Sequence, residues 1–172
     1  MLSEILKITL PALLVFLAGY LAIERLLREE ANRRKAELNI NSKKITTPIR
    51  LQAYERIVLF LERISPDSLL VRVNQPSLTA QKFQAALLST IRSEWEHNLS
   101  QQIYISPKAW GLVKNAKDNV IKLINTNSNE IEGKQPAIML SQSILESLVE
   151  LENHPTARAI DFLKKEVNEY FY

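Results

Sequence analysis

The segment "EWEHNLSQQIYISPKAW", residues 94–110, decides how the chain folds, because it lies between two long stretches with helical apolar spacing. After it, Ser106 and Pro107 form a helix-start signal, a capping hydroxyl followed by proline at the first helical position. We therefore predict a hairpin that joins the two central helices. The apolar side of the first of these helices, from about residue 79 to 99, comprises Phe83, Leu87, Leu88, Ile91, Trp95 and Leu99. That of the second comprises Ala109, Trp110, Val113, Ala116, Val120 and Ile124.

Further helices are predicted on both sides of this hairpin. "PIRLQAYERIVLFLERIS" begins at Pro48 and stops at Ser65–Pro66. Its apolar stripe, which is expected to be buried, comprises Tyr54, Ile57, Val58, Leu61 and Ile64. "LLVRV", residues 69–73, is predicted as a short extended piece, and "NTNSNEIEGKQP", residues 125–136, as a polar loop. Two more helices, at about 137–153 and 156–170, are separated by His154–Pro155. The fold class is all-α, with a small helical bundle over residues 48–172.

The amino-terminal region has the composition of a membrane anchor. After a short segment, residues 1–7, the residues from Ile8 to Ile23 carry no charge. They span about 24 Å as a helix, and apolar residues on both sides lengthen the stretch. We predict a transmembrane helix over residues 8–27. A cleaved signal peptide is the main alternative, but Glu4 lies in its amino-terminal region and no small-x-small site precedes the charged residues.

The charges that follow predict the orientation of this anchor. Residues 28–47 form a predicted basic juxtamembrane helix and linker, the linker being residues 38–47. Basic residues cluster here, whereas only Lys7 and the amino terminus precede the span. The positive-inside rule then places the amino terminus outside and the bundle in the cytoplasm. The residues expected at anionic lipid head groups are Arg25, Arg28, Arg33, Arg34 and Lys35.

The charge distribution argues against nucleic-acid binding. The net charge of +3 arises before the bundle, since residues 51–172 carry 13 Lys+Arg and 14 Asp+Glu, a net of −1. A nucleic-acid module would carry its positive patch on the folded domain. Three isolated glycines exclude glycine-rich phosphate loops, and the lack of cysteine excludes thiolate metal sites. No cofactor is predicted.

The spacing Glu94-x-x-His97 is the best candidate for a metal site, because it matches the helical motif of di-iron carboxylate bundles. Such a site needs a second copy of the motif, and the other histidine, His154, lacks it. Serine motifs of hydrolases are also absent from the sequence. We therefore predict no metal ligand and no catalytic residue.

The helical wheel assigns structural roles within the hairpin. Ile91, Trp95 and Leu99 define the buried direction, which places His97 on the boundary and points Asn98 inward. We expect Asn98 to bind backbone groups of the following turn, and Trp95 and Trp110 to anchor the core between the two central helices. The residues expected to form a partner surface are Glu94, His97, Gln101 and Gln102.

Three blocks also suggest a family: "ITTPIRLQAYERIVLFLERISPDSLLVRV", "EWEHNLSQQIYIS" and "AWGLVKNAKDNVIKLIN". The chain resembles an uncharacterised bacterial family of short single-pass inner-membrane proteins with a cytoplasmic helical domain. This resemblance covers nearly the whole chain. It implies an inner-membrane location and carries over no activity.

The resulting hypothesis is a non-enzymatic, membrane-anchored interaction or scaffold protein whose cytoplasmic bundle binds a protein partner or self-associates. Two alternatives stay open. One is a small membrane-tethered metal-dependent enzyme that uses Glu94 and His97. The other is a lipid-surface sensor that uses the basic juxtamembrane helix.

Overall fold

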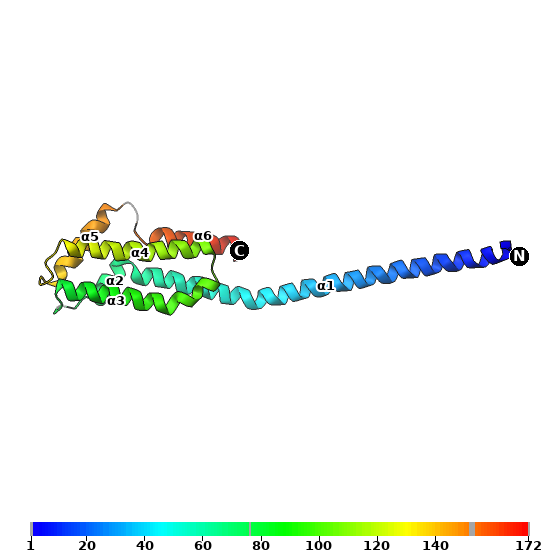
Figure 1. Ribbon diagram of the computed structural model, residues 1–172, viewed down its shortest axis with the longest axis horizontal. Coiled ribbons are helices and arrows are strands. Elements are labelled where there is room, and N and C mark those ends of the chain that lie inside the picture. Colours follow the sequence, from blue (N-terminus) through cyan, green and yellow to red (C-terminus); the bar gives the residue numbers. More distant parts are fainter. Residues whose placement is uncertain (1, 76, 152–153, 172) are drawn as a thin grey trace. The chain divides into compact units, whose positions relative to one another are not determined.

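A computed structural model describes residues 2–75, 77–151 and 154–171. The elements in these ranges are all helical, and no strand occurs among them, which confirms the all-α class. In chain order they are α1 (Leu2–Ile64), α2 (Pro66–Val73), α3 (Ala80–Asn98), the 3-10 helix η1 (Leu99–Ile103), α4 (Pro107–Asn129), α5 (Ala137–Glu150) and α6 (Ala157–Phe171) (Figure 1).

The chain divides into two compact units, Met1–Thr46 and Thr47–Tyr172. Unit 1 contains residues 2–46 of α1, and unit 2 contains the rest of α1 and the other helices. The first part of the predicted transmembrane helix, residues 8–15, lies outside the residues whose side chains are described. Among the described residues, no helix has an apolar stretch long enough to cross a membrane.

Unit 2 is a helical bundle built around the hairpin of α3 and α4. These two helices pack against each other and both contact α5, while α6 packs on α4 and α2 packs on α3 (Figure 1). The last turns of α1 supply part of the same core. The largest fully buried side chains come from α1 to α5 and include Tyr54, Phe60, Phe83, Ile91, Ile124, Leu140 and Ile144. Apolar periodicity therefore identifies most of the core.

Capping residues position the two central helices. Thr79 precedes α3, and its Oγ1 accepts a hydrogen bond from the Lys82 amide at 3.4 Å. Ser106 precedes α4, and its Oγ accepts from the Ala109 amide at 3.0 Å, with Pro107 at the first helical position. Side-chain caps satisfy amides that have no partner inside the helix. The predicted start of the second central helix is therefore confirmed.

Three predicted segments differ from the structure. "LLVRV" is not extended but belongs to α2, because Pro66 starts a new helix instead of only ending the previous one. Residues 38–47, predicted as a linker, are helical within α1 and contain neither glycine nor proline. Residues 125–129, predicted as loop, extend α4, where the amide groups of Asn125 and Asn127 find partners on α3 and α5.

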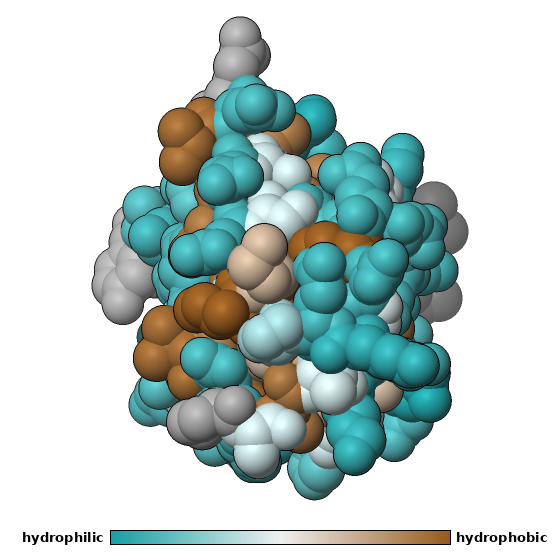
Figure 2. Space-filling model, turned by 90° about the vertical axis from the view of Figure 1, so that its left-hand side faces the viewer, coloured by the Kyte–Doolittle hydropathy of each residue, from teal (hydrophilic) through white to brown (hydrophobic). Residues whose placement is uncertain are grey.

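The outer face at one end of the bundle is mostly polar. Figure 2 shows this end as teal, hydrophilic side chains with separate brown, hydrophobic patches between them. The exposed apolar side chains on this face therefore form local patches and not a continuous apolar surface.

Candidate partner-binding surface

The corner between α3 and α4 is shaped by a change of helix type. The wheel that predicts Leu99 as buried assumes about 100° per residue, but η1 follows α3 directly with about three residues per turn. Gln101 then lies below Asn98, and both side chains are buried, whereas Leu99 is 42% exposed. The predicted positions of Leu99 and Gln101 are therefore wrong: the leucine faces solvent and the glutamine faces the core.

Asn98 faces inward but binds a different turn from the predicted one. Its Nδ2 donates to the carbonyl oxygen of Glu94 at 2.8 Å, one turn earlier in α3. This is a bond from a side chain back to the carbonyl four residues earlier, so it lies within the last full turn of α3. The predicted bond to the following turn is not the one it makes.

Glu94 joins three helices of the bundle. Its Oε1 lies 2.9 Å from Arg63 Nε on α1 and 3.5 Å from Arg72 Nη1 on α2. The Glu94 side chain is only 16% exposed. A carboxylate held by two guanidinium groups in this half-buried position stabilises the packing of α3 on α1 and α2. Glu94 therefore has a structural contact where the sequence predicts a partner-binding one.

The neighbourhood of His97 offers little support for a metal site. Its Nδ1 lies 2.8 Å from the Ser93 carbonyl oxygen, so this nitrogen carries the proton in that contact. Glu94, the other half of the predicted motif, is engaged by the two arginines. Within the described part of the chain, no group of three or more His, Asp or Glu side chains lies close enough together to hold a metal ion.

Two arginines of α1, which the sequence does not single out, hold the corner in place. Arg50 Nε donates to the Tyr104 carbonyl at 3.1 Å, and Arg56 Nη2 donates to the His97 carbonyl at 3.4 Å. Cations are favoured at the carbonyl end of a helix, where His97 lies. The sequence contains one signal for these contacts. Arg56 is seven residues before Arg63, which binds Glu94, so both arginines lie on the same face of α1.

The two tryptophans form an aromatic stack between α3 and α4. The Trp95 and Trp110 ring centroids are 4.7 Å apart with 23° between the planes, and Phe60 of α1 adds a third ring 5.7 Å from Trp95. The Lys117 ammonium lies 4.6 Å from the Trp95 ring centroid. Both tryptophans are half-buried, so the stack closes the edge of the core and leaves one side to a cation.

A second polar contact of α1 lies inside the core. Tyr54 Oη donates to Glu166 Oε2 of α6 at 2.9 Å, and both residues are buried. Burial and the adjacent carboxylate raise the pKa of Tyr54 to about 12, since both disfavour the phenolate. The apolar stripe predicts that Tyr54 is buried, but Glu166, on a polar-looking stretch of α6, carries no sequence signal.

The corner leaves a set of side chains facing solvent. We name them the corner surface: His97, Leu99, Gln102, Ile103 and Tyr104, all exposed. Ile103 has 73% of its surface exposed. Of the four residues predicted for a partner surface, His97 and Gln102 lie here, while Glu94 and Gln101 face inward. The sequence misses the three apolar members of the surface.

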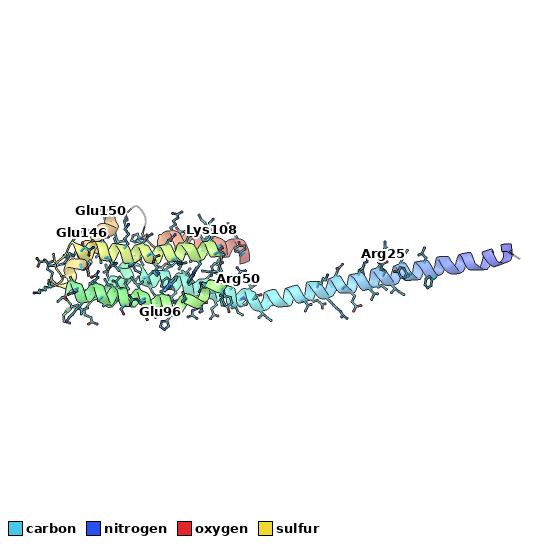
Figure 3. All side chains as sticks on the ribbon, viewed as in Figure 1. Arg25, Arg50, Glu96, Lys108, Glu146 and Glu150 are labelled. Carbon is cyan, nitrogen blue, oxygen red and sulfur yellow. The ribbon has the colours of Figure 1, made fainter. Side chains whose placement is uncertain are left out.

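The predicted lipid-facing residues lie in unit 1. Arg25, Arg28, Arg33, Arg34 and Lys35 are all exposed; Figure 3 labels the first of them. Arg28 pairs with Glu24, and Arg34 pairs with Glu30 at 3.0 Å, in each case one turn apart. Such exposed pairs stabilise the helix only slightly.

Comparison with known proteins identifies a family but no function. Residues 1–170 match the model of a family described as a family of unknown function, DUF7935. No curated protein and no solved structure matches the chain. The sequence-based resemblance to an uncharacterised family is confirmed to that extent. The chain belongs to this family of unknown function.

Proposed function

We propose that the protein is a membrane-anchored interaction protein. Residues 8–27 span a bacterial inner membrane once, and the cytoplasmic bundle binds a protein partner through the corner surface. The observation that supports this proposal is that both units expose large apolar side chains, which water solvates poorly.

In unit 1, the exposed apolar side chains continue the uncharged stretch of the sequence. They cover more than half of the helix circumference, and the other residues between Phe16 and Ile23 are uncharged alanine and glycine. The exposed apolar residues are Phe16, Leu17, Tyr20, Leu21, Ile23, Leu26 and Leu27. Phe16 alone is 76% exposed. A helix that is apolar on all sides favours immersion in hydrocarbon over a position along the interface, because it lacks a polar face. The basic residues that follow favour a cytoplasmic bundle.

In unit 2, the corner surface has the features of a small binding site. Its side chains project from a corner that Arg50 and Arg56 tie to α1, so little ordering is required when a partner binds. Leu99, Ile103 and Tyr104 supply apolar contact area, and His97 with Gln102 supplies polar groups. Protein interfaces combine apolar and polar side chains in this way.

Site-specific photocrosslinking in cells tests the proposal. A photoreactive phenylalanine at Ile103 should form a discrete adduct with a partner or with a second copy of the chain. The same probe at Val71, an equally apolar and exposed position on α2, is the matched control. Leu99→Asp should abolish the Ile103 adduct. Identical adducts at both positions, or no adduct at Ile103, would contradict a partner site at the corner.

Contact with anionic lipid is a second candidate function, favoured by the exposure of Arg25, Arg33 and Lys35. Residues 24–172 should then bind vesicles that contain phosphatidylglycerol, with an affinity that falls steeply between low and high salt. Vesicle binding whose affinity does not change with salt, or a lack of binding, would contradict a lipid-binding function. A metal-dependent enzyme at Glu94 and His97 is not proposed, because two arginines hold the Glu94 carboxylate.

A further inference from the structure

A series of hollows follows α4 along the side that faces α6 and the end of α5. The first, of about 750 Å³, lies between the amino-terminal half of α4 and α6. A second, of about 290 Å³, shares Leu112, Asn115 and Arg158 with the first. A third, of about 330 Å³, shares Asn119 and Pro155 with the second. Neighbouring hollows share lining residues, so they lie in a row along α4, and we call this row the α4 groove.

The shape of the α4 groove suits a chain better than a compact ligand. Its lining begins at Pro107 and reaches Thr126, so it follows α4 for about 28 Å. An extended peptide of about eight residues has this length. Gly111 lies in the wall of the first hollow, and a Cβ atom built there would meet no atom within 4 Å. The missing side chain therefore widens the groove at this point.

The charges of the α4 groove favour an anionic occupant. The first hollow gathers three basic side chains, Lys108, Arg158 and Lys165, against one carboxylate, Asp161. The Lys108 ammonium lies 5.0 Å from the Phe162 ring centroid, which keeps its charge at the wall of the groove. Further along, Lys122 adds a fourth cation, while the carboxylate of Asp118 pairs with Lys117 at 3.1 Å.

The amides of the groove add a way to recognise a peptide backbone. Asn115 and Asn119 are exposed and one turn apart on α4, so both face the groove. A side-chain amide can donate to a peptide carbonyl and accept from a peptide amide. Deeper in the groove, Asn127 is already satisfied by the Leu123 carbonyl and by two serines of α5, so it forms part of the wall.

From these features we propose that the α4 groove binds an extended acidic peptide segment of a partner protein. The cations neutralise its carboxylates and the exposed amides bind its backbone. The groove is separate from the corner surface, so this proposal does not depend on a partner at the corner. A lipid head group would share the anionic chemistry, but it would fill a single hollow and leave the rest of the groove unused.

Binding of a labelled peptide to the full chain in detergent micelles tests this proposal. The probe is a fluorescein-labelled decapeptide rich in glutamate, followed by anisotropy; a lysine-rich decapeptide is its counterpart. We expect saturable binding of the acidic probe, weakened about tenfold by Arg158→Glu with Lys165→Glu. Lys134→Glu makes the same kind of charge change on the exposed loop before α5 and should leave binding within about twofold.

A second pair of variants tests shape separately from charge. Gly111→Trp should block the first hollow and reduce binding at least tenfold, whereas Gly111→Ala should retain it, and circular dichroism confirms that both fold. The proposal is overturned if no acidic peptide binds, or if Gly111→Trp and the charge-reversed variant bind like the wild type. It is also overturned if the same cations bind phosphatidylglycerol vesicles but not the peptide.

Discussion

Helix α1 contacts the rest of the bundle in two ways that use similar chemistry at different depths. At α6, Tyr54 and the carboxylate of Glu166 meet inside the core. At α3, Arg63 and the carboxylate of Glu94 meet at its edge, where the arginine side chain is 48% exposed. A glutamate is the acceptor in both contacts. The difference in burial determines which contact specifies the fold and which one positions a surface.

The buried contact tolerates little change, because removing one partner leaves the other without solvent. The edge contact is weaker, since water and ions can replace a lost partner. The edge contact positions a surface instead. Together with Arg50 and Arg56, it fixes α3 and the corner against α1, so that the apolar residues of the corner surface face outward. Buried contacts therefore stabilise the bundle, whereas edge contacts position the corner surface, which is the proposed binding site.

The largest effect should come from the buried contact. Glu166→Ala leaves the Tyr54 hydroxyl in the core without its carboxylate and should lower the unfolding free energy by about 3 kcal/mol. Chemical denaturation of the full chain in detergent measures this. Glu169→Ala, an exposed position on the same helix, serves as control and should change stability by less than about 0.5 kcal/mol. Equal losses of stability for Glu166→Ala and Glu169→Ala would show that the buried contact does not stabilise the bundle.

The same contact should give the bundle a dependence on alkaline pH. The pKa of Tyr54 is raised to about 12 in the folded protein, so the unfolded chain ionises first, near pH 10. The stabilising contribution is complete below pH 10 and is lost as pH rises through 12, by at most about 3 kcal/mol.

Thermal unfolding between pH 9 and 12 measures this dependence, with Tyr54→Phe as the control that lacks the ionising group. The wild type should lose stability more steeply than the variant over that interval. Parallel curves would show that the Tyr54 pKa does not shift on folding.

At the edge, Glu94→Ala should lower the unfolding free energy by about 1 kcal/mol, and the loss should shrink in 1 M salt. Double-mutant cycles that combine Glu94→Ala with Arg63→Ala or with Arg72→Ala measure the interaction energy of Glu94 with each arginine. A loss as large as that of Glu166→Ala, or one that salt leaves unchanged, would argue that Glu94 behaves as a core residue.

An effect as small as that of Glu94→Ala is expected at the end of α3. Asn98→Leu removes the hydrogen bond to the Glu94 carbonyl but keeps an inward-facing side chain, so we expect a loss of about 1 kcal/mol and a melting temperature lower by a few degrees. Differential scanning calorimetry can resolve this change. A melting temperature equal to that of the wild type would show that this hydrogen bond does not stabilise the end of α3.

Much of the bundle follows from local signals. Apolar residues at helical spacing identify the core of α3, α4 and the end of α1, and Ser106–Pro107 identifies the start of α4, because capping depends on neighbouring residues only. The signal is weakest where an element is short. "LLVRV" has no period long enough to distinguish helix from strand, and its helix depends on Pro66 and on burial of Leu69 and Leu70.

The candidate surface is less predictable, because it depends on geometry that begins where the regular helix stops. A switch from α-helix to 3-10 helix after Asn98 rotates every later side chain relative to the wheel, which exchanges the positions of Leu99 and Gln101. The contacts of Glu94 depend on Arg63 and Arg72, which lie 31 and 22 residues earlier in the sequence. No local pattern reports such pairs.

The most direct test of the proposed anchor and orientation is a fractionation of cells that produce the full chain and a variant lacking residues 1–27. We predict that the full chain stays in the membrane pellet after extraction with sodium carbonate, and that the truncated chain does not. Protease added to intact spheroplasts should leave the bundle uncut. Release of the full chain by carbonate, or digestion of the bundle from outside, would contradict a single-pass protein with a cytoplasmic bundle.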